Sequence, residues 1–197
     1  MLRIALTGGI ATGKSHVLDL CRRRGVPCLD ADTLAHGVEA AGTEATQAIA
    51  ARFGPGVLGE DGAVDRAKLG PIVFADAAAR RELEAIVHPA VYRAITAGLR
   101  AFELTESSVL AVVDVPLLFE TGRASDFDAV IATVCPVAMQ VERLVARGMN
   151  DAEARQRLAA QLPAAEKAAR AQYMIDTSGT FQDTEAQVRR ILERLAA

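Results

Sequence analysis

Aromatic residues are scarce in this sequence of 197 residues: they make up 4% of it, and there is no tryptophan. All-β folds are enriched in aromatic and β-branched residues, whereas alanine, which is abundant here, favours helices. The composition therefore argues against an all-β sandwich. Apolar residues (51%) and charged residues (24%) are close to ordinary globular usage, which excludes disorder as the main state. With about 150 residues per domain as a guide, we expect one globular unit with appendages.

Paired cysteines, excess positive charge and long apolar runs are also missing. Cys21, Cys28 and Cys135 are odd in number and form no CxxC pattern, which excludes a disulfide framework and a zinc site. A net charge of −3 gives no basic surface for nonspecific nucleic-acid binding. No basic leader is visible, and the longest apolar run, Val109–Phe119, is shorter than the ~18 residues of a membrane span. We expect a cytoplasmic protein without nucleic-acid or membrane partners, as a monomer or weak homo-oligomer.

Short apolar segments bounded by turn residues predict the strands of a buried parallel sheet. The strong candidates are Leu2–Thr7, Val109–Asp114 and Ala129–Val134, and the weaker ones are Val26–Leu29 and Tyr173–Ile175. Helical patterns lie between them, which favours an α/β fold with right-handed crossovers. In the last helix, Thr184 and Gln187 match a capping box.

Two stretches interrupt the alternation of strands and helices. Between the second and third predicted strands only helical spacing of apolar residues is found, so we predict an all-helical insertion. Within it, Pro89 is expected to be the first residue of a helix, where proline is tolerated. His88 then either caps that helix or contacts a ligand. The second stretch, Val137 to Ala171, is helical and rich in arginine.

A glycine-rich motif of the form GxxxxGK[ST] follows the first predicted strand and precedes a helical pattern. It consists of Gly8, Gly9, Ile10, Ala11, Thr12, Gly13, Lys14 and Ser15. Glycines let backbone N–H groups close around phosphate oxygens, Lys14 reaches the β- and γ-phosphates, and the Ser15 hydroxyl ligates Mg²⁺. The motif predicts ATP and Mg²⁺ as cofactors, with His16 as the next residue of the nucleotide-binding segment. No Asn-Lys-x-Asp motif occurs, which argues against a GTPase.

Carboxylates follow the second and third predicted strands, where ligands of open parallel sheets bind. Phosphoryl transfer to a hydroxyl needs a carboxylate that orients it or accepts its proton, and a further oxygen ligand for Mg²⁺. Asp32 fits either role. The alternative is that Asp30 or Asp32 only caps the next helix. Asp114 either holds a Mg²⁺-bound water or caps its strand end.

The sequence resembles the dephospho-coenzyme A kinase family over almost its whole length. In chain order the matching residues are Leu6-Thr7-Gly8-Gly9-Ile10, Val26-Pro27, Asp30-Ala31-Asp32, Asp65-Arg66, Leu69, Val73-Phe74, Leu83-Glu84, Ile86, His88-Pro89, Val91, Pro116-Leu117-Leu118-Phe119-Glu120, Arg143, Arg147-Gly148-Met149, Arg157, Gln161, Glu166-Lys167, Ile175-Asp176 and Gly179. The segments at 116–120 and 88–89 are the most telling, because a generic P-loop protein has no reason to carry them.

The resemblance implies an ATP-dependent kinase that phosphorylates the 3′-hydroxyl of dephospho-coenzyme A. The implied catalytic residues are Lys14, Asp32 as the residue that orients the acceptor hydroxyl, and Arg143 as a lid arginine, with Arg147 as the second lid arginine. His88, Pro116, Leu117 and Glu120 are implied on the acceptor side, although a packing role for the 116–120 turn and surface ion pairing for the arginines stay open.

The implied fold is a P-loop kinase-like α/β domain with a parallel five-stranded sheet flanked by helices. Its core comprises residues 1–32, 109–136 and 172–197. The helical insertion, residues 33–108, is assigned to acceptor binding, and residues 137–171 are assigned to a helical lid.

The sequence departs from the family pattern at Ala11, His16, Gln172 and Thr177. A left-handed conformation at Ala11 costs of order 1 kcal/mol, and the last two departures put the nucleotide-base contacts in doubt. Two other functions stay open. One is a P-loop kinase for another small acceptor, such as a nucleoside monophosphate or shikimate, and the other is a module that senses ATP without phosphoryl transfer.

Overall fold

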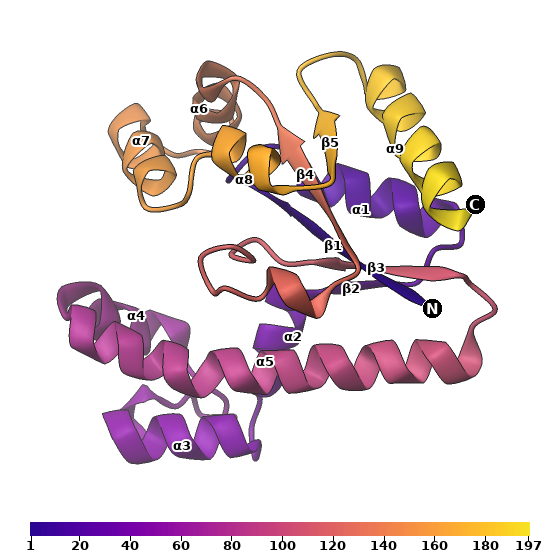
Figure 1. Cartoon of the computed structure of the whole chain (residues 1–197). Helices are drawn as coiled ribbons and strands as arrows, with labels where there is room; N and C mark the ends of the chain where they lie inside the picture. Colours follow the sequence, from indigo (N-terminus) through magenta and orange to yellow (C-terminus); the bar gives the residue numbers. More distant parts are fainter. The chain divides into compact units, whose positions relative to one another are not determined.

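The computed structural model describes all 197 residues as two compact units, Met1–Leu29 with Ala101–Ala197, and Asp30–Arg100. The first unit is built on a five-stranded sheet of order β2-β3-β1-β4-β5 (Figure 1). Its strands are β1 (Leu2–Gly8), β2 (Cys28–Asp30), β3 (Leu110–Asp114), β4 (Ala129–Val134) and β5 (Tyr173–Asp176). The predicted α/β fold with a parallel five-stranded sheet is confirmed.

The central strands are buried on both faces, which explains why their sequences are apolar without alternation. β1 pairs in parallel with β3 and β4, and β4 pairs in parallel with β5. In this register Leu6 lies opposite both Asp114 and Ile131. The carboxyl ends of these strands therefore meet at one edge of the sheet, where β1 runs into the glycine-rich loop.

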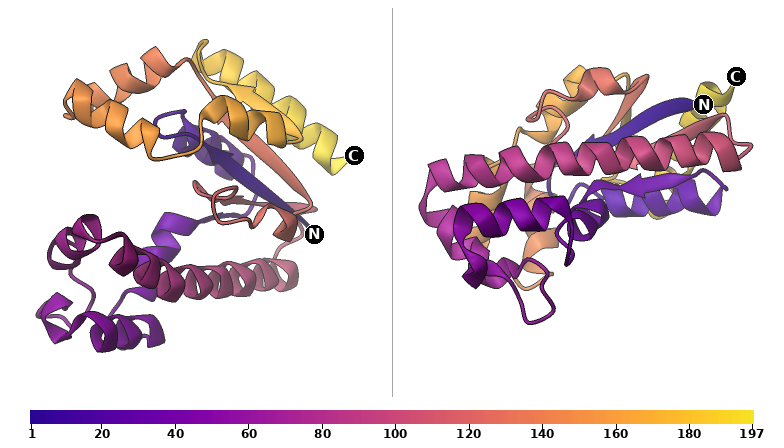
Figure 2. Two further views of the ribbon diagram at one scale, coloured as in Figure 1. Left: turned by 60° about the vertical axis from the view of Figure 1, so that its left-hand side comes forward. Right: turned by 90° about the horizontal axis from the view of Figure 1, so that it is seen from below.

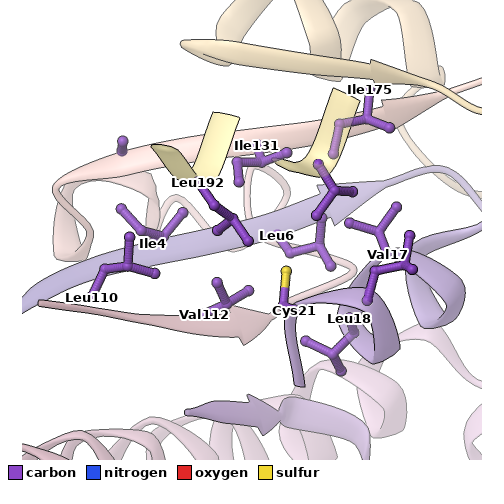
Figure 3. Close-up of a cluster of buried hydrophobic side chains, with 13 residues drawn as sticks. Ile4, Leu6, Val17, Leu18, Cys21, Leu110, Val112, Ile131, Ile175 and Leu192 are labelled. Atoms are coloured by element: carbon purple, nitrogen blue, oxygen red, sulfur yellow. The ribbon is translucent and has the colours of Figure 1, made fainter. Parts of the chain in front are cut away.

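Two helices cover one face of the sheet. They are α1 (Lys14–Arg23) and α9 (Phe181–Ala196). The unit also contains α6 (Val137–Val145), α7 (Asp151–Ala159), α8 (Ala164–Arg170) and the 3₁₀ turn η2 (Ala124–Asp126). Val17 and Leu18 of α1 and Leu192 of α9 pack with Ile4 and Leu6 of β1 in the main core (Figure 3). No helix is long and apolar enough to cross a membrane.

The predicted capping box at the start of the last helix is wrong by four residues. Thr180 and Asp183 form it, because Thr180 Oγ1 accepts from the Asp183 N–H and the Asp183 carboxylate accepts from the Thr180 N–H. Gln187 instead binds the backbone of Asp176, both as donor (2.8 Å) and as acceptor (2.9 Å). The glutamine thus ties α9 to the end of β5 rather than capping its own helix.

The second unit is helical, as predicted, apart from one antiparallel bridge between Leu58 and Val64. Its elements are α2 (Ala31–Val38), α3 (Glu44–Phe53), the 3₁₀ turn η1 (Pro55–Val57), α4 (Arg66–Ala75) and α5 (Ala77–Thr105), whose last residues belong to the first unit. Ile49, Val57 and Leu69 form its core, and α3 and α4 lie beside α5 (Figure 2).

The prediction that a helix starts at Pro89 is wrong, because α5 runs through this proline without a break. A proline inside a helix removes one backbone hydrogen bond and costs about 3 kcal/mol. Apolar side chains on both sides of it offset this cost: Ile86 packs on the core of this unit, and Val91 and Ile95 are buried. His88 therefore lies inside a helix, and the capping interpretation of this residue is wrong as well.

Candidate active site

The glycine-rich loop joins β1 to α1 and leaves the first turn of the helix open to a ligand. Gly13 precedes α1 with a left-handed backbone (φ 88°), no side chain caps the helix, and its first turn holds no acidic residue. Free N–H groups at a helix start attract anions. Lys14 Nζ donates to the carbonyls of Gly8 and Gly9, both at 3.2 Å, and Ser15 is exposed. The loop thus has the donors that a polyphosphate requires.

Close packing against β4 and α6 explains the two glycines at the start of the loop. A Cβ atom at Gly8 would lie 2.2 Å from Thr133 Oγ1, and one at Gly9 would lie 2.8 Å from Gln140 Nε2. Thr133 Oγ1 is also 2.6 Å from Thr12 Oγ1, which donates to the Gly9 carbonyl at 2.7 Å. A side chain at either glycine would push the loop away from this support.

Side chains from distant segments hold the backbone of the loop. Gln140 Nε2, on α6, donates to the Ile10 carbonyl (2.6 Å), and Gln161 Oε1, between α7 and α8, accepts from the Ile10 N–H (3.1 Å). Thr177 Oγ1, after β5, donates to the Thr12 carbonyl (2.8 Å). Sequence analysis missed Gln140. The signal that could have revealed it is a polar residue at a position where the apolar spacing of the helix predicts burial, and Gln140 is only 2% exposed.

Arg143, predicted as a lid arginine, is bound to the loop itself. Its half-buried guanidinium donates through Nη1 to the Ala11 carbonyl (3.1 Å) and through Nη2 to the Thr177 carbonyl (2.7 Å). Burial raises the pKa of the neighbouring Cys135 thiol, and the Arg143 charge opposes that rise. Arg147, by contrast, is exposed, and its side chain makes neither a hydrogen bond nor an ion pair. The positive charge of Arg143 is thus held at the loop, whereas the charge of Arg147 is bound to no other group of the protein.

The turn after β3 contains Pro116, Leu117 and Glu120, which were predicted to lie on the acceptor side. Lys167 Nζ, on α8, lies 2.7 Å from the Glu120 carboxylate and donates to the Pro116 carbonyl at 2.7 Å. Glu120 also accepts from the Leu162 N–H (3.1 Å). Of the three predicted residues, Leu117 has an exposed side chain, whereas the Pro116 carbonyl and Glu120 Oε1 are bound within the protein. Sequence analysis named Lys167 among the residues shared with the family but assigned it no role.

Asp114 is the last residue of β3 and lies in register with Leu6 of β1. It is 5% exposed, at the edge of the sheet from which the loop leaves β1. Asp114 therefore ends its strand at the same edge of the sheet as the phosphate loop.

Asp32 and His88 lie in the unit of residues 30–100. Asp30 Oδ1 accepts from the N–H groups of Asp32 (2.9 Å) and Thr33 (3.1 Å), so Asp30 caps α2. The predicted capping role of Asp30 is confirmed. The Asp32 side chain is exposed and makes no hydrogen bond or ion pair, so its carboxylate is available to a ligand. His88 is half-buried in α5, and its ring makes no hydrogen bond.

Comparison with known proteins assigns the chain to a family. A family model described as "Dephospho-CoA kinase" matches residues 2–183. The chain belongs to the dephospho-CoA kinase family. A relative of that name from Anaeromyxobacter dehalogenans is 48% identical over 98% of this chain and 91% of its own length.

Solved structures share the fold of this family. TT1252 from Thermus thermophilus superposes with a TM-score of 0.83 at 32% identity, covering 100% of this chain and 98% of its own. Dephospho-CoA kinase from Campylobacter jejuni superposes with a TM-score of 0.72 at 24% identity over 98% of this chain and 96% of its own, which shows the likeness of fold alone.

Three departures from the dephospho-CoA kinase pattern have different structural settings. Gln172 accepts from the Val130 N–H (2.8 Å) near the start of β4, at the edge of the sheet opposite to the loop. Gln172 thus lies at the end of the strands away from the phosphate loop. Thr177 is buried beside the loop, where it can influence nucleotide binding through Thr12. His16 packs edge-on against Phe181, with ring centroids 4.9 Å apart.

The fourth departure, Ala11, is the one non-glycine residue with a positive φ (59°). This conformation costs about 1–2 kcal/mol. The Ala11 methyl group is buried against Val141, Leu144 and Ala154, which stabilises the folded state by ~0.8 kcal/mol. A glycine here would also gain entropy in the unfolded chain, worth about 0.4–1 kcal/mol. The backbone strain, which favours glycine at this position, nearly cancels the packing and the unfolded-chain entropy, which favour alanine.

We therefore expect Ala11→Gly to change the free energy of unfolding by less than about 1 kcal/mol, because lost packing offsets relieved strain. Ala11→Val should destabilise the protein by ~2 kcal/mol or more, since a β-branched residue tolerates positive φ poorly. Urea unfolding followed by circular dichroism measures both. A strongly stabilised glycine variant would show that the methyl group contributes nothing.

Other arginines of the 137–171 segment form surface ion pairs one helical turn apart. Arg155 pairs with Asp151 (2.7 Å) and Arg157 with Glu153 (3.1 Å), all on α7. Such exposed pairs contribute little to stability. Arg155 and Arg157 are thus engaged in surface ion pairs, whereas Arg143 and Arg147 are the arginines predicted for the lid.

Proposed function

We propose that this chain transfers the γ-phosphoryl group of ATP to the 3′-hydroxyl of dephospho-coenzyme A, which yields coenzyme A and ADP. The observation that carries the proposal is a complete phosphate loop, Gly8 to Ser15, in a chain whose residues 2–183 match the dephospho-CoA kinase model. The loop alone does not name the acceptor, since P-loops occur in many enzymes. The family match supplies the name of the acceptor.

Holding the nucleotide is the task of the loop and the start of α1. The open N–H groups and Lys14 bind the phosphates, whose negative charge they neutralise. Arg143 adds a positive charge through its contact with the Ala11 carbonyl. Preorganised charges at the transferred group are usually the largest contribution to phosphoryl transfer. The side chains that hold Ile10 and Thr12 keep these donors in place before ATP arrives.

A magnesium ion fits the oxygen donors at this edge of the sheet. The exposed Ser15 hydroxyl and the Asp114 carboxylate are hard oxygen ligands of the kind that Mg²⁺ prefers, directly or through water. A Mg²⁺ ion held there would reduce the negative charge of the phosphates. We assign Ser15 as a direct ligand and Asp114 as a ligand of a Mg²⁺-bound water.

The acceptor hydroxyl needs its own orienting group. We assign this role to Asp32, because its carboxylate is exposed while Asp30 satisfies the cap of α2. A carboxylate can accept the hydroxyl proton as the bond to phosphorus forms. His88 and Leu117 contribute acceptor contacts. Residues 33–108 bind the acceptor, and residues 137–171 form the lid, from which the free side chain of Arg147 reaches the phosphoryl group.

Incubation with ATP, Mg²⁺ and dephospho-coenzyme A, followed by mass spectrometry, tests this function. We expect the acceptor to gain the mass of one phosphate while ATP is converted to ADP. Parallel incubations with a nucleoside monophosphate and with shikimate test the competing acceptors. ADP release with one of these, and none with dephospho-coenzyme A, would overturn the proposal.

A further inference from the structure

Lys167 is a buried lysine for which the proposed chemistry has no use. Its side chain on α8 is 0% exposed. Moving an ammonium group out of water is costly unless charge and hydrogen bonds compensate it. Both of its compensating partners belong to the turn after β3: the Glu120 carboxylate and the Pro116 carbonyl, each at 2.7 Å. A buried charge with two partners fixes the shape of that turn.

Further contacts tie the same turn to the rest of the first unit. Thr7 Oγ1, one residue before the phosphate loop, donates to the Pro116 carbonyl at 3.3 Å. The N–H of Leu162, which precedes α8, donates to the Glu120 carboxylate at 3.1 Å. Leu118 is fully buried, whereas Leu117 next to it is 39% exposed. The turn is anchored at both ends and presents Leu117 between them.

We propose that Lys167 is a positioning residue for the acceptor: its buried ammonium holds the Pro116–Glu120 turn in the shape that contacts dephospho-coenzyme A. This inference rests on the proposed function. Glu120 is then a partner of Lys167 rather than a ligand of the acceptor, and Leu117 is the side chain that the turn offers. Lys167 itself touches neither substrate.

The phosphate loop is held by a different set of side chains, which predicts a selective effect. Gln140, Gln161 and Thr177 bind the loop backbone, and none of their side chains is hydrogen-bonded to the Pro116–Glu120 turn. Lys167 contacts the turn and makes no hydrogen bond to the loop. Loss of Lys167 should therefore weaken acceptor binding and leave ATP binding intact, whereas general destabilisation would affect both.

The test compares steady-state kinetics and thermal unfolding of three variants of the Lys167–Glu120 pair, and of one control variant, with those of the unaltered chain. Lys167→Met combined with Glu120→Leu replaces the buried pair by apolar residues of similar length, a change that folded proteins often tolerate. Glu120→Ala removes one partner of the ammonium. Glu120→Gln is the conservative rescue, because its side-chain oxygen can still accept from Lys167 and Leu162. Arg23→Met, which breaks an exposed ion pair with Asp19 on α1, is the control with unchanged kinetics.

For the double variant we expect a Tm near that of the unaltered chain, a KM for dephospho-coenzyme A raised on the order of tenfold, and an unchanged KM for ATP. Glu120→Ala should raise the acceptor KM less, and Glu120→Gln should raise it least. A merely structural role predicts that a variant with normal Tm has normal KM values.

Three outcomes would overturn the inference. The first is a stable double variant with an unaltered acceptor KM, and the second is a parallel rise in both KM values. The third is a Glu120→Gln variant as impaired as Glu120→Ala, which would mean that the carboxylate itself binds the acceptor. If the double variant does not fold, the two Glu120 variants still decide between these results. Absence of dephospho-coenzyme A phosphorylation by the unaltered chain would instead refute the proposed function.

Discussion

Replacing Lys14 with methionine is expected to lower kcat on the order of 10²–10³-fold, the loss typical when one preorganised charge or donor at the reacting group is removed. Lys14 Nζ lies over the loop, bound to the Gly8 and Gly9 carbonyls at 3.2 Å, and can transfer these hydrogen bonds to phosphate oxygens. Methionine has a similar length and keeps the packing, so the loss reports on the charge. ADP release with dephospho-coenzyme A as acceptor measures kcat.

The matched control for Lys14→Met is Arg23→Met, which removes one positive charge from the exposed far end of the same helix, α1. Its kcat should equal that of the unaltered chain. ATP affinity, measured by calorimetry, should fall in Lys14→Met by much less than kcat, because the loop N–H groups continue to bind the phosphates. A Lys14→Met enzyme that turns over at the normal rate would contradict the assignment of this residue to the transferred group.

The parts of the molecule that could be predicted from sequence are those whose cause is local. The three central strands are visible because burial on both faces makes their sequences apolar throughout. The phosphate loop is visible because its function requires particular residues at a fixed spacing. The capping role of Asp30 follows from its place directly before α2.

What could not be predicted depends on contacts between distant segments. Ile10 is bound by Gln140 and Gln161, which lie 130 and 151 residues further along the chain. No local pattern reveals such pairs. The continuity of α5 through Pro89 has a similar origin, since packing on both sides of the proline outweighs its local preference to start a helix.

Lys167 shows the same limit for charged residues. In sequence it is one of several cations in the 137–171 segment, and surface exposure is the usual fate of lysine. The structure buries it completely, while Arg155 and Arg157 nearby form exposed pairs. Composition does not distinguish these cases. Only the fold, which brings the turn after β3 to α8, supplies the partners that make burial tolerable.

Asp32→Asn is expected to lower kcat on the order of 10²–10⁴-fold, the usual range for loss of a group that accepts a proton in the transition state. The amide keeps the size of the carboxylate but cannot take up the hydroxyl proton. Folding should be retained, because the cap of α2 is provided by Asp30. ATP affinity should also be retained, since the phosphates are held by the loop. Single-turnover kinetics with dephospho-coenzyme A separate the chemical step from binding and product release.

Asp30→Asn is the matched control, because it removes one carboxylate two residues away and keeps a side-chain oxygen that can cap α2. Its kcat should stay close to normal. The comparison also separates the kinase from a module that only senses ATP, because such a module would keep both ATP binding and function in Asp32→Asn. Lost turnover with retained ATP affinity, in Asp32→Asn alone, supports the kinase. An active Asp32→Asn enzyme would show that another group orients the acceptor hydroxyl, and His88, half-buried and without a hydrogen bond of its own, would be the next residue to test.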